Sequence, residues 1–379
     1  MSEDTETADD QQLAVVVAKP RSQVAIESLQ AEGLYDDTRS ITEWTADSVA
    51  VPVTAPPQET QFREVVRQVG KRRLRTLDDH LRERGWTDAE IDAAPSSWAV
   101  LGSVVLVDIG DSPRPAEVGD ALLALHGEAE TVLARHGISG EHREPSVEVI
   151  AGDGDTETVH TEHGTRYAMD LSEVMFSPGN KAERARMGEI VSEERGTRPS
   201  ERASGEAASE GGERVLDMFA GIGYFTLPMA RAGAHVTAVE RNPTAFRFLV
   251  ENVMLNDVDE RVHPYRADCR EVVPGFASEG RADRVVMGYY EASAPRAEDS
   301  RAPPDASHEY LDSALDALAP GGVLHMHEAT PDALVFDRPI ERLEAAAAEA
   351  DRDVEVLDTR RVKEYSEGVA HVVVDARVQ

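Results

Sequence analysis

The chain has 379 residues, enough for two or three domains, and 72 acidic against 39 basic residues give it a formal net charge of −33. The single cysteine, Cys269, excludes a disulfide framework and a multi-cysteine zinc site, and no signal peptide or membrane-spanning apolar run is evident. The carboxylates are spread through apparently folded segments, so we expect a halophilic, cytoplasmic protein. Because the Debye length falls to about 3 Å in molar salt, the acidic charge does not exclude a nucleic-acid partner.

The first part of the chain predicts a small α+β module. Residues 1–12 are polar and acidic and are expected to be disordered. The β-branched run Leu13–Lys19 predicts a strand, a helical pattern opens at Ser22, and Ser48–Val53 predicts a second strand. We therefore expect an N-terminal module over residues 13–57.

Residues 58–172 predict a linking α+β region whose first helix would carry the densest basic cluster of the chain. The cluster consists of Arg63, Arg67, Lys71, Arg72, Arg73 and Arg75. Such a strip is either a solvated helix face or a surface that contacts RNA phosphates, and both interpretations stay open. Farther along, Val104–Ile109 and Val147–Ile150 predict strands, and Pro115–His136 predicts a long amphipathic helix between them.

Residues 173–379 alternate strand and helix patterns, which predicts an α/β domain with a doubly wound parallel sheet. The Gly-, Ser-, Glu- and Arg-rich stretch 193–212 has no periodicity and predicts a flexible insertion. At the C-terminus, Val354–Asp358 and Val369–Val378 have no helix between them, so we expect an antiparallel hairpin that closes the sheet.

The segment Val215–Asn242 contains the elements of a nucleotide-cofactor site. A short strand leads into a tight turn in which Gly221 and Gly223 allow close approach of the backbone to a ligand. A helix from about Phe225 to Ala232 follows, and a second strand then ends at Glu240, whose carboxylate suits a ribose diol. This order predicts an adenosine-binding turn.

The turn favours S-adenosylmethionine (SAM) over a dinucleotide. A dinucleotide site would need a third glycine, which the sequence AGIGYF and the residue after it do not supply, and the acidic Asp217 suits the ammonium of an amino-acid tail. Asp268 follows the third strand at the position where such folds bind adenine, with the backbone of Cys269 beside it. The alternative for Asp268 is a cap at a strand end.

The fourth strand runs into DRVVMGYY, residues 283–290, where the usual grip on a target nitrogen is absent. Enzymes that methylate such nitrogens normally have (D/N)PP(Y/F) or Asn-Leu-Pro here, but this chain has Gly288 and Tyr289. The catalytic group is therefore unknown, and Gly288, Tyr289 and Tyr290 are candidates near the acceptor. The two tyrosines could stack on a flipped-out base or pack in the core.

Residues 174–189, VMFSPGNKAERARMGE, gather polar donors upstream of the turn. The donors are Ser177, Asn180, Lys181, Arg184 and Arg186. They could hold a carboxylate, or they could belong to a capped amphipathic helix that begins near Asn180.

Six segments resemble the archaeal and eukaryotic family that modifies the purine at position 37 of tRNA. They are VMFSPGNKAERARMG, DMFAGIGYFTLP, FRFLVENVMLN, DRVVMGYY, GGVLHMHE and KEYSEGVAHVVVDARV. The family has two branches, the guanine-37 N1-methyltransferases and the wybutosine-synthesis aminocarboxypropyltransferases. The resemblance implies a class I SAM-dependent methyltransferase fold, Rossmann-like, with a C-terminal antiparallel hairpin.

Tyr224, the MGYY motif, His325 and HEAT at 327–330 resemble the aminocarboxypropyl branch. That branch implies transfer of the 3-amino-3-carboxypropyl group of SAM to C7 of 4-demethylwyosine in tRNA-Phe, leaving methylthioadenosine. Gly288 would open space for the tricyclic base. By resemblance, SAM is bound by Ser177, Arg184, Asp217, Phe219, Ala220, Gly221, Gly223, Glu240, Asp268 and Cys269.

Two alternatives remain beside this interpretation. The N-terminal module resembles the tRNA-elbow-reading domain that is more familiar in the N1-methyltransferase branch, so N1-methylation of guanosine 37 is the second hypothesis. A non-catalytic RNA-binding protein with a SAM fold is the third, although Glu240 and Asp268 speak against it. The sequence requires no metal and is silent on the proton acceptor and the oligomeric state.

Overall fold

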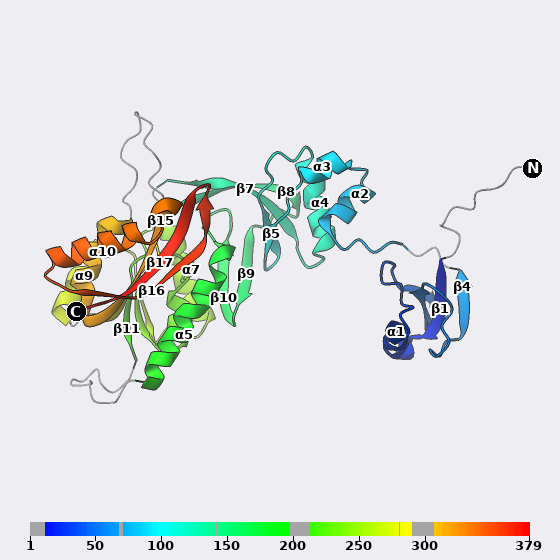
Figure 1. The fold of residues 1–379 in the computed structure, drawn as a ribbon, viewed down its shortest axis with the longest axis horizontal. Helices are drawn as coiled ribbons and strands as arrows, with labels where there is room; N and C mark the ends of the chain where they lie inside the picture. Colours follow the sequence, from blue (N-terminus) through cyan, green and yellow to red (C-terminus); the bar gives the residue numbers. More distant parts are fainter. Residues whose placement is uncertain (1–11, 68–70, 141, 198–211, 280, 290–306) are drawn as a thin grey trace, which may run out of the picture. The chain divides into compact units, whose positions relative to one another are not determined.

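The computed structural model describes residues 12–67, 71–140, 142–197, 212–279, 281–289 and 307–379 (Figure 1). The chain divides into two compact units, Met1–Ile91 and Asp92–Gln379. Within the described ranges, no helix is both long and apolar enough to cross a membrane.

The first unit is built on a four-stranded antiparallel sheet of order β2-β3-β1-β4. Its elements are β1 (Leu13–Ala18), α1 (Ser22–Ala31), β2 (Thr42–Thr45), β3 (Ser48–Val53) and β4 (Glu64–Arg67). Helix α1 packs Ala25 and Leu29 against Val15, Val17 and Val51 of the sheet. Because β4 pairs with β1, this sheet extends beyond residue 57. Two short helices follow, α2 (Leu77–Glu83) and α3 (Asp88–Asp92).

The basic cluster does not lie on a helix, so that prediction is wrong. Arg67 ends β4, and the chain from Lys71 is extended, pairing its backbone with residues 38–40. The β-branched residues Val65 and Val66 favour a strand, and pairing with β1 completes it. Arg63, Arg72 and Arg75 form ion pairs with Asp47 (2.9 Å), Asp79 (3.7 Å) and Asp37 (3.0 Å).

The second unit begins with a four-stranded sheet of order β5-β6-β7-β8. Its elements are β5 (Trp98–Leu101), β6 (Val104–Val107), α4 (Pro115–Leu125), β7 (Thr131–Ser139) and β8 (Glu144–Gly152). The predicted helix Pro115–His136 is therefore too long. It ends before Gly127, and the buried run Thr131–Ala134 is a strand because it pairs with β6 on one side and β8 on the other.

A seven-stranded sheet forms the remainder, with order β13-β12-β11-β14-β15-β17-β16. Its strands are β11 (Arg214–Asp217), β12 (His235–Val239), β13 (Val262–Tyr265), β14 (Ala282–Met287), β15 (Leu318–Pro331), β16 (Val354–Ser366) and β17 (Val369–Val378). The first five are parallel, and β17 and β16 close the edge antiparallel. The predicted doubly wound sheet with its C-terminal hairpin is confirmed.

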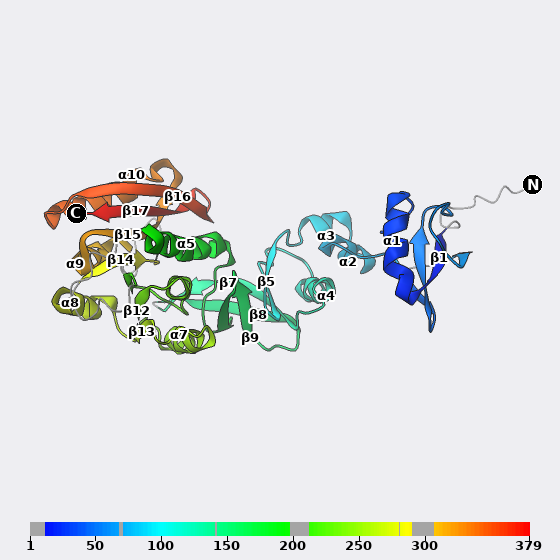
Figure 2. The same cartoon turned by 90° about the horizontal axis from the view of Figure 1, so that it is seen from below.

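Helices cover both faces of this sheet (Figures 1 and 2). One face carries α5 (Lys181–Thr197), α6 (Thr226–Arg231) and α7 (Pro243–Leu255), and the other carries α8 (Cys269–Glu279), α9 (Leu311–Ala317) and α10 (Asp337–Glu349). Helix α5 ends at Thr197. Residues 193–197, which were expected in the insertion, are therefore helical. Residues 198–211 of that prediction lie outside the described part of the chain.

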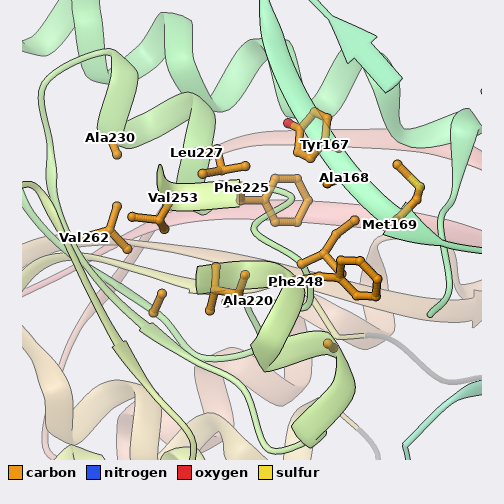
Figure 3. Packing of buried hydrophobic residues seen from close by; sticks show 14 of the residues in the cluster. Tyr167, Ala168, Met169, Ala220, Phe225, Leu227, Ala230, Phe248, Val253 and Val262 are labelled. Atoms are coloured by element: carbon orange, nitrogen blue, oxygen red, sulfur yellow. The ribbon is translucent and has the colours of Figure 1, made fainter. Parts of the chain in front are cut away.

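A β-hairpin that the sequence analysis missed joins the first face. It consists of β9 (Glu157–Glu162) and β10 (Thr165–Asp170), and its side chains Tyr167, Ala168 and Met169 pack into the cluster around Phe225 and Phe248 (Figure 3). This packing places the hairpin, α5 and the turn after β11 around one core.

Candidate functional site

The turn after β11 has the backbone geometry expected of a ligand-binding loop. Gly221 and Gly223 have φ values of 57° and 102°, in the left-handed region that favours glycine. A Cβ at Gly223 would come within 2.9 Å of Leu227 Cγ. The turn therefore requires glycine at both positions for its shape and for its packing.

Glu240 binds this turn to the end of β12. Its Oε2 accepts a hydrogen bond from the Gly221 N–H at 2.8 Å, and its Oε1 accepts one from the Asn242 N–H at 2.7 Å. Burial raises the pKa of Glu240, although these backbone bonds oppose the shift. Since a carboxylate has roughly four acceptor sites, capacity remains for ribose hydroxyls.

Asp217 is fully buried at the start of the turn. Its Oδ2 accepts from Thr226 Oγ1 at 2.7 Å and its Oδ1 from the Phe219 N–H at 3.4 Å. Burial raises the pKa of Asp217 to about 6. The contacts fix the turn to α6, and Ala220 adds a backbone bond from its N–H to the Val239 carbonyl at 2.9 Å.

Asp268 lies immediately before helix α8, and its carboxylate accepts a hydrogen bond from the backbone of the first helical turn. Its Oδ1 accepts from the Arg270 N–H at 2.9 Å, and the Arg270 guanidinium binds both carboxylate oxygens. Hydrogen bonds from Arg270 lower the pKa of Asp268, whereas burial raises the pKa of the neighbouring Cys269 thiol to about 12. The Arg270 guanidinium also lies 4.8 Å from the centroid of the Tyr310 ring, and that ring packs edge-on against Phe219.

The segment Met175–Ser177 is tied to the turn by Tyr224. The Tyr224 hydroxyl donates to the Met175 carbonyl, and its ring lies 5.8 Å from that of Phe176. The Tyr224 ring also packs against Gly221, where any Cβ would overlap the ring. Ser177 thus comes to the same edge of the sheet as the turn after β11.

Arg184 lies behind Ser177, and each of its three guanidinium nitrogens donates a hydrogen bond to a protein oxygen. Its Nε and Nη2 donate to Glu162 at 2.7 and 3.0 Å, and its Nη1 donates to the Ser177 carbonyl at 3.0 Å. The side chain is 3% exposed. Burial alone would raise the pKa of Glu162, but hydrogen bonds from His160 and Arg184 lower it to about 2. Arg184 therefore positions the Ser177 backbone.

The expected space beside Gly288 is occupied, so that interpretation is wrong. A Cβ at Gly288 would lie 2.8 Å from Phe225 Cε2, because the phenylalanine ring packs directly on this glycine. Tyr289 stacks near Phe219, with ring centroids 5.3 Å apart. Tyr290 lies outside the described residues.

The tip of the β7–β8 hairpin reaches the same site, which the sequence analysis missed. Asn242 Nδ2 donates to the His142 carbonyl at 3.2 Å, and the Arg143 guanidinium lies 5.6 Å from the Tyr289 ring centroid. The two residues are 100 positions apart in the sequence, so no local sequence pattern predicts the contact. The tip of the hairpin therefore contacts the loop after β12 and Tyr289.

Two family models match this chain. The TRM5/TYW2 methyltransferase domain matches residues 158–197 and 196–357, and the TYW2 N-terminal domain matches residues 77–156. The chain belongs to the TRM5/TYW2 family.

Individual relatives lie in both branches of the TRM5/TYW2 family. A tRNA(Phe) (4-demethylwyosine(37)-C(7)) aminocarboxypropyltransferase of Pyrococcus horikoshii is 36% identical over 290 residues, which is 75% of this chain and 90% of the relative. The tRNA (guanine(37)-N(1))-methyltransferase Trm5b of Pyrococcus abyssi is 28% identical over 97% of this chain and 99% of its own. The crystal structure of P. horikoshii TYW2 in complex with MeSAdo matches with a TM-score of 0.60 at 32% identity, covering 79% of this chain and 96% of that one.

The two histidines that resemble the TYW2 branch lie inside the sheet. His325 Nδ1 bonds Asp375 at 2.6 Å and its Nε2 contacts Arg284, while His327 Nδ1 bonds His371 Nε2 at 3.0 Å. Burial lowers the pKa of His327 to about 4. In this TRM5/TYW2 chain both side chains therefore form buried hydrogen bonds between β15 and β17.

Proposed function

We propose that this protein transfers the 3-amino-3-carboxypropyl group of SAM to C7 of 4-demethylwyosine at position 37 of tRNA-Phe, releasing methylthioadenosine. The observation that carries the proposal is the TYW2 N-terminal domain match over 77–156, directly before the catalytic match. The P. horikoshii relative, named for this reaction, supports it. The chain is a SAM-dependent transferase of the TRM5/TYW2 type.

The site fits SAM in the arrangement of its polar groups. We assign the ribose to Glu240 and the adenine edge to Asp268 and the Cys269 backbone, with the amino-acid tail beside Ser177. Since three carbons on the sulfonium are electrophilic, SAM can give up either the methyl or the aminocarboxypropyl group, according to which carbon lies in line with the nucleophile. Arg184 contributes by holding Ser177 in place.

The acceptor is a tRNA, and two features support contacts with it. Arg143 and Tyr289 present a cation and an aromatic face beside the cofactor turn, which suits a flipped-out base. The basic residues of the first unit remain candidates for phosphate contacts, although Arg63, Arg72 and Arg75 also form ion pairs. We also propose that the chain has three functional parts, that it comes from a high-salt environment and that it is cytoplasmic.

One observation favours N1-methylation of guanosine 37 as a second candidate. Trm5b of P. abyssi matches 97% of this chain, including the first unit. The deciding experiment supplies SAM labelled either on the methyl or on the carboxyl carbon, with tRNA-Phe bearing 4-demethylwyosine or unmodified guanosine. Carboxyl label in the modified tRNA supports our proposal, and methyl label on guanosine overturns it.

Replacing Glu240 by Ala tests the ribose assignment separately. We expect SAM affinity to fall about 10-fold or more while tRNA binding persists, since a charged hydrogen-bond partner contributes about 1.5–3 kcal/mol. The exposed Glu251 of α7 provides the matched control E251A, which should leave both affinities unchanged. Unchanged SAM affinity in E240A would show that the ribose lies elsewhere.

A further inference from the structure

Strand β10 belongs to a two-stranded sheet, so one row of its backbone groups needs partners other than strands. It pairs antiparallel with β9 from Thr165 to Asp170. In such a pair every second residue directs its N–H and C=O away from the neighbouring strand. Buried groups of this kind require hydrogen-bond partners, and Ala168 is only 6% exposed. Here the outward groups of Arg166 and Ala168 bind side chains of helix α7.

Two asparagines, one helical turn apart on α7, are the partners of this row. Asn256 Oδ1 accepts from the Arg166 N–H at 2.9 Å, and its Nδ2 donates to the Arg166 carbonyl at 2.7 Å. Asn252 Oδ1 accepts from the Ala168 N–H at 2.6 Å, and its Nδ2 donates to the Ala168 carbonyl at 3.0 Å. The spacing fits because four helical residues rise about 6 Å and two strand residues about 6.7 Å. The two carboxamides therefore take the place of a further strand beside β10.

The two asparagines differ in their remaining hydrogen bond. Asn252 Nδ2 also donates to the Ile222 carbonyl at 3.0 Å, and Ile222 lies between the two glycines of the turn after β11. Asn256 Nδ2 donates instead to the carbonyl of Asn252 within the same helix, at 2.8 Å. Asn252 and Ile222 are both 0% exposed. The carboxamide of Asn252 therefore joins β10 to the turn inside the core.

The Ile222 carbonyl lies in the part of the turn that most needs external support. Its neighbours Gly221 and Gly223 both have positive φ, and a segment with glycine on either side loses much conformational freedom when it becomes ordered. Glu240 accepts from the Gly221 N–H, and Asn252 donates to the carbonyl of the next residue. The turn is therefore held by one side chain from the end of β12 and by one from α7.

The hairpin gives Asn252 a fixed point of reference. Tyr167 and Met169, on either side of Ala168, are each 1% exposed and belong to the hydrophobic core around Phe225 (Figure 3). We propose that Asn252 is a positioning residue for the cofactor, because it fixes the glycine turn against β10 in the conformation that binds adenosine. Since its side chain is inaccessible, Asn252 acts through the Ile222 backbone and does not touch the ligand.

This role rests on the proposed function, because it takes the turn beside Glu240 as the adenosine site. SAM and methylthioadenosine both contain adenosine, so the affinity of each should depend on Asn252. The two ideas can fail separately. Unchanged SAM affinity in E240A would refute the ribose assignment, whereas a weakened E240A beside an unaffected N252A would refute only the role of Asn252.

The test measures the affinities of SAM and methylthioadenosine by titration calorimetry for the wild type, N252A and N256A. N252A should weaken both ligands about 10-fold, because the released turn must be ordered again when a ligand binds. N256A is the matched control, since it loses the same kind of bonds to β10 but keeps the bond to Ile222. It should lose stability in urea unfolding and still bind both ligands within about 2-fold of the wild type.

Equal weakening of the ligands in N252A and N256A would overturn the proposal, because both asparagines would then act only through the stability of the hairpin. Unchanged affinities in N252A would overturn it too. Should N252A fail to fold, amide hydrogen exchange of the wild type decides. Methylthioadenosine should slow exchange at the Ala168 N–H, which binds Asn252, more than at the Arg166 N–H, which binds Asn256. Equal slowing at the two amides would refute the role of Asn252.

Discussion

Replacing Glu162 by Gln removes the charge opposite Arg184 and conserves the shape of the side chain. Both side chains are buried, with exposed fractions of 4% and 3%, and the two hydrogen bonds between them measure 2.7 and 3.0 Å. The variant therefore leaves a buried guanidinium without its carboxylate. It also loosens the support of Ser177, which Arg184 holds through the backbone.

The expected loss follows from the pKa of Glu162. The pKa falls from 4.5 to about 2 on folding, and a shift of this size corresponds to about 3 kcal/mol. Removal of one partner of a buried ion pair typically costs about 3–5 kcal/mol, which agrees. Since the folded-state pKa is lowered, this stabilisation is present above pH 4.5 and is lost as the pH falls toward 2.

Urea unfolding of wild type and E162Q across this pH range measures the effect. E162Q should lose about 3 kcal/mol at pH 7 and should lack the part of the acid dependence between pH 4.5 and 2. The exposed pair Glu173–Arg247, 3.1 Å apart, gives the control E173Q, which should lose less than about 1 kcal/mol. If E162Q were no less stable than E173Q, the reasoning about this buried pair would be refuted.

Three further predictions concern the core and the surface. G288A should lose about 1–3 kcal/mol in urea unfolding because its Cβ would press on Phe225, whereas G275A, with open space around it, should not be destabilised. The raised pKa of Asp217 means that its contribution is complete below pH 3.8 and is lost as the pH rises through about 6, so D217N should remove a decline of up to about 3 kcal/mol from a pH series. With a net charge of −33, the melting temperature should rise by about 4 °C or more between 0.1 and 1 M KCl, and a flat response would contradict a high-salt origin.

Local patterns predicted the parts of the site that depend on neighbours in sequence. The strand His235–Val239 ends one residue before Glu240, and its bounds follow from a short apolar run with a polar residue at each end. The glycines of the turn are likewise interpretable, because positive φ is a property of single residues. The same reasoning found the C-terminal hairpin.

Long-range pairing accounts for what the sequence did not reveal. Asn252 and Ala168 are 84 positions apart, and nothing near either residue identifies its partner. The run Thr131–Ala134 became a strand only because β6 and β8 flank it. Gly288 was compatible with open space or with close packing, and only the position of Phe225 decides between the two.

The contact between His142 and Asn242 has a consequence for how the chain can be recombined. The TYW2 N-terminal family model ends at residue 156, yet the hairpin tip within it meets the loop that follows Glu240. The boundary between the two family models therefore does not coincide with the boundary of the candidate site. An exchange of N-terminal domains between family members would replace His142 and Arg143, and with them the contacts to Asn242 and Tyr289 at the candidate site.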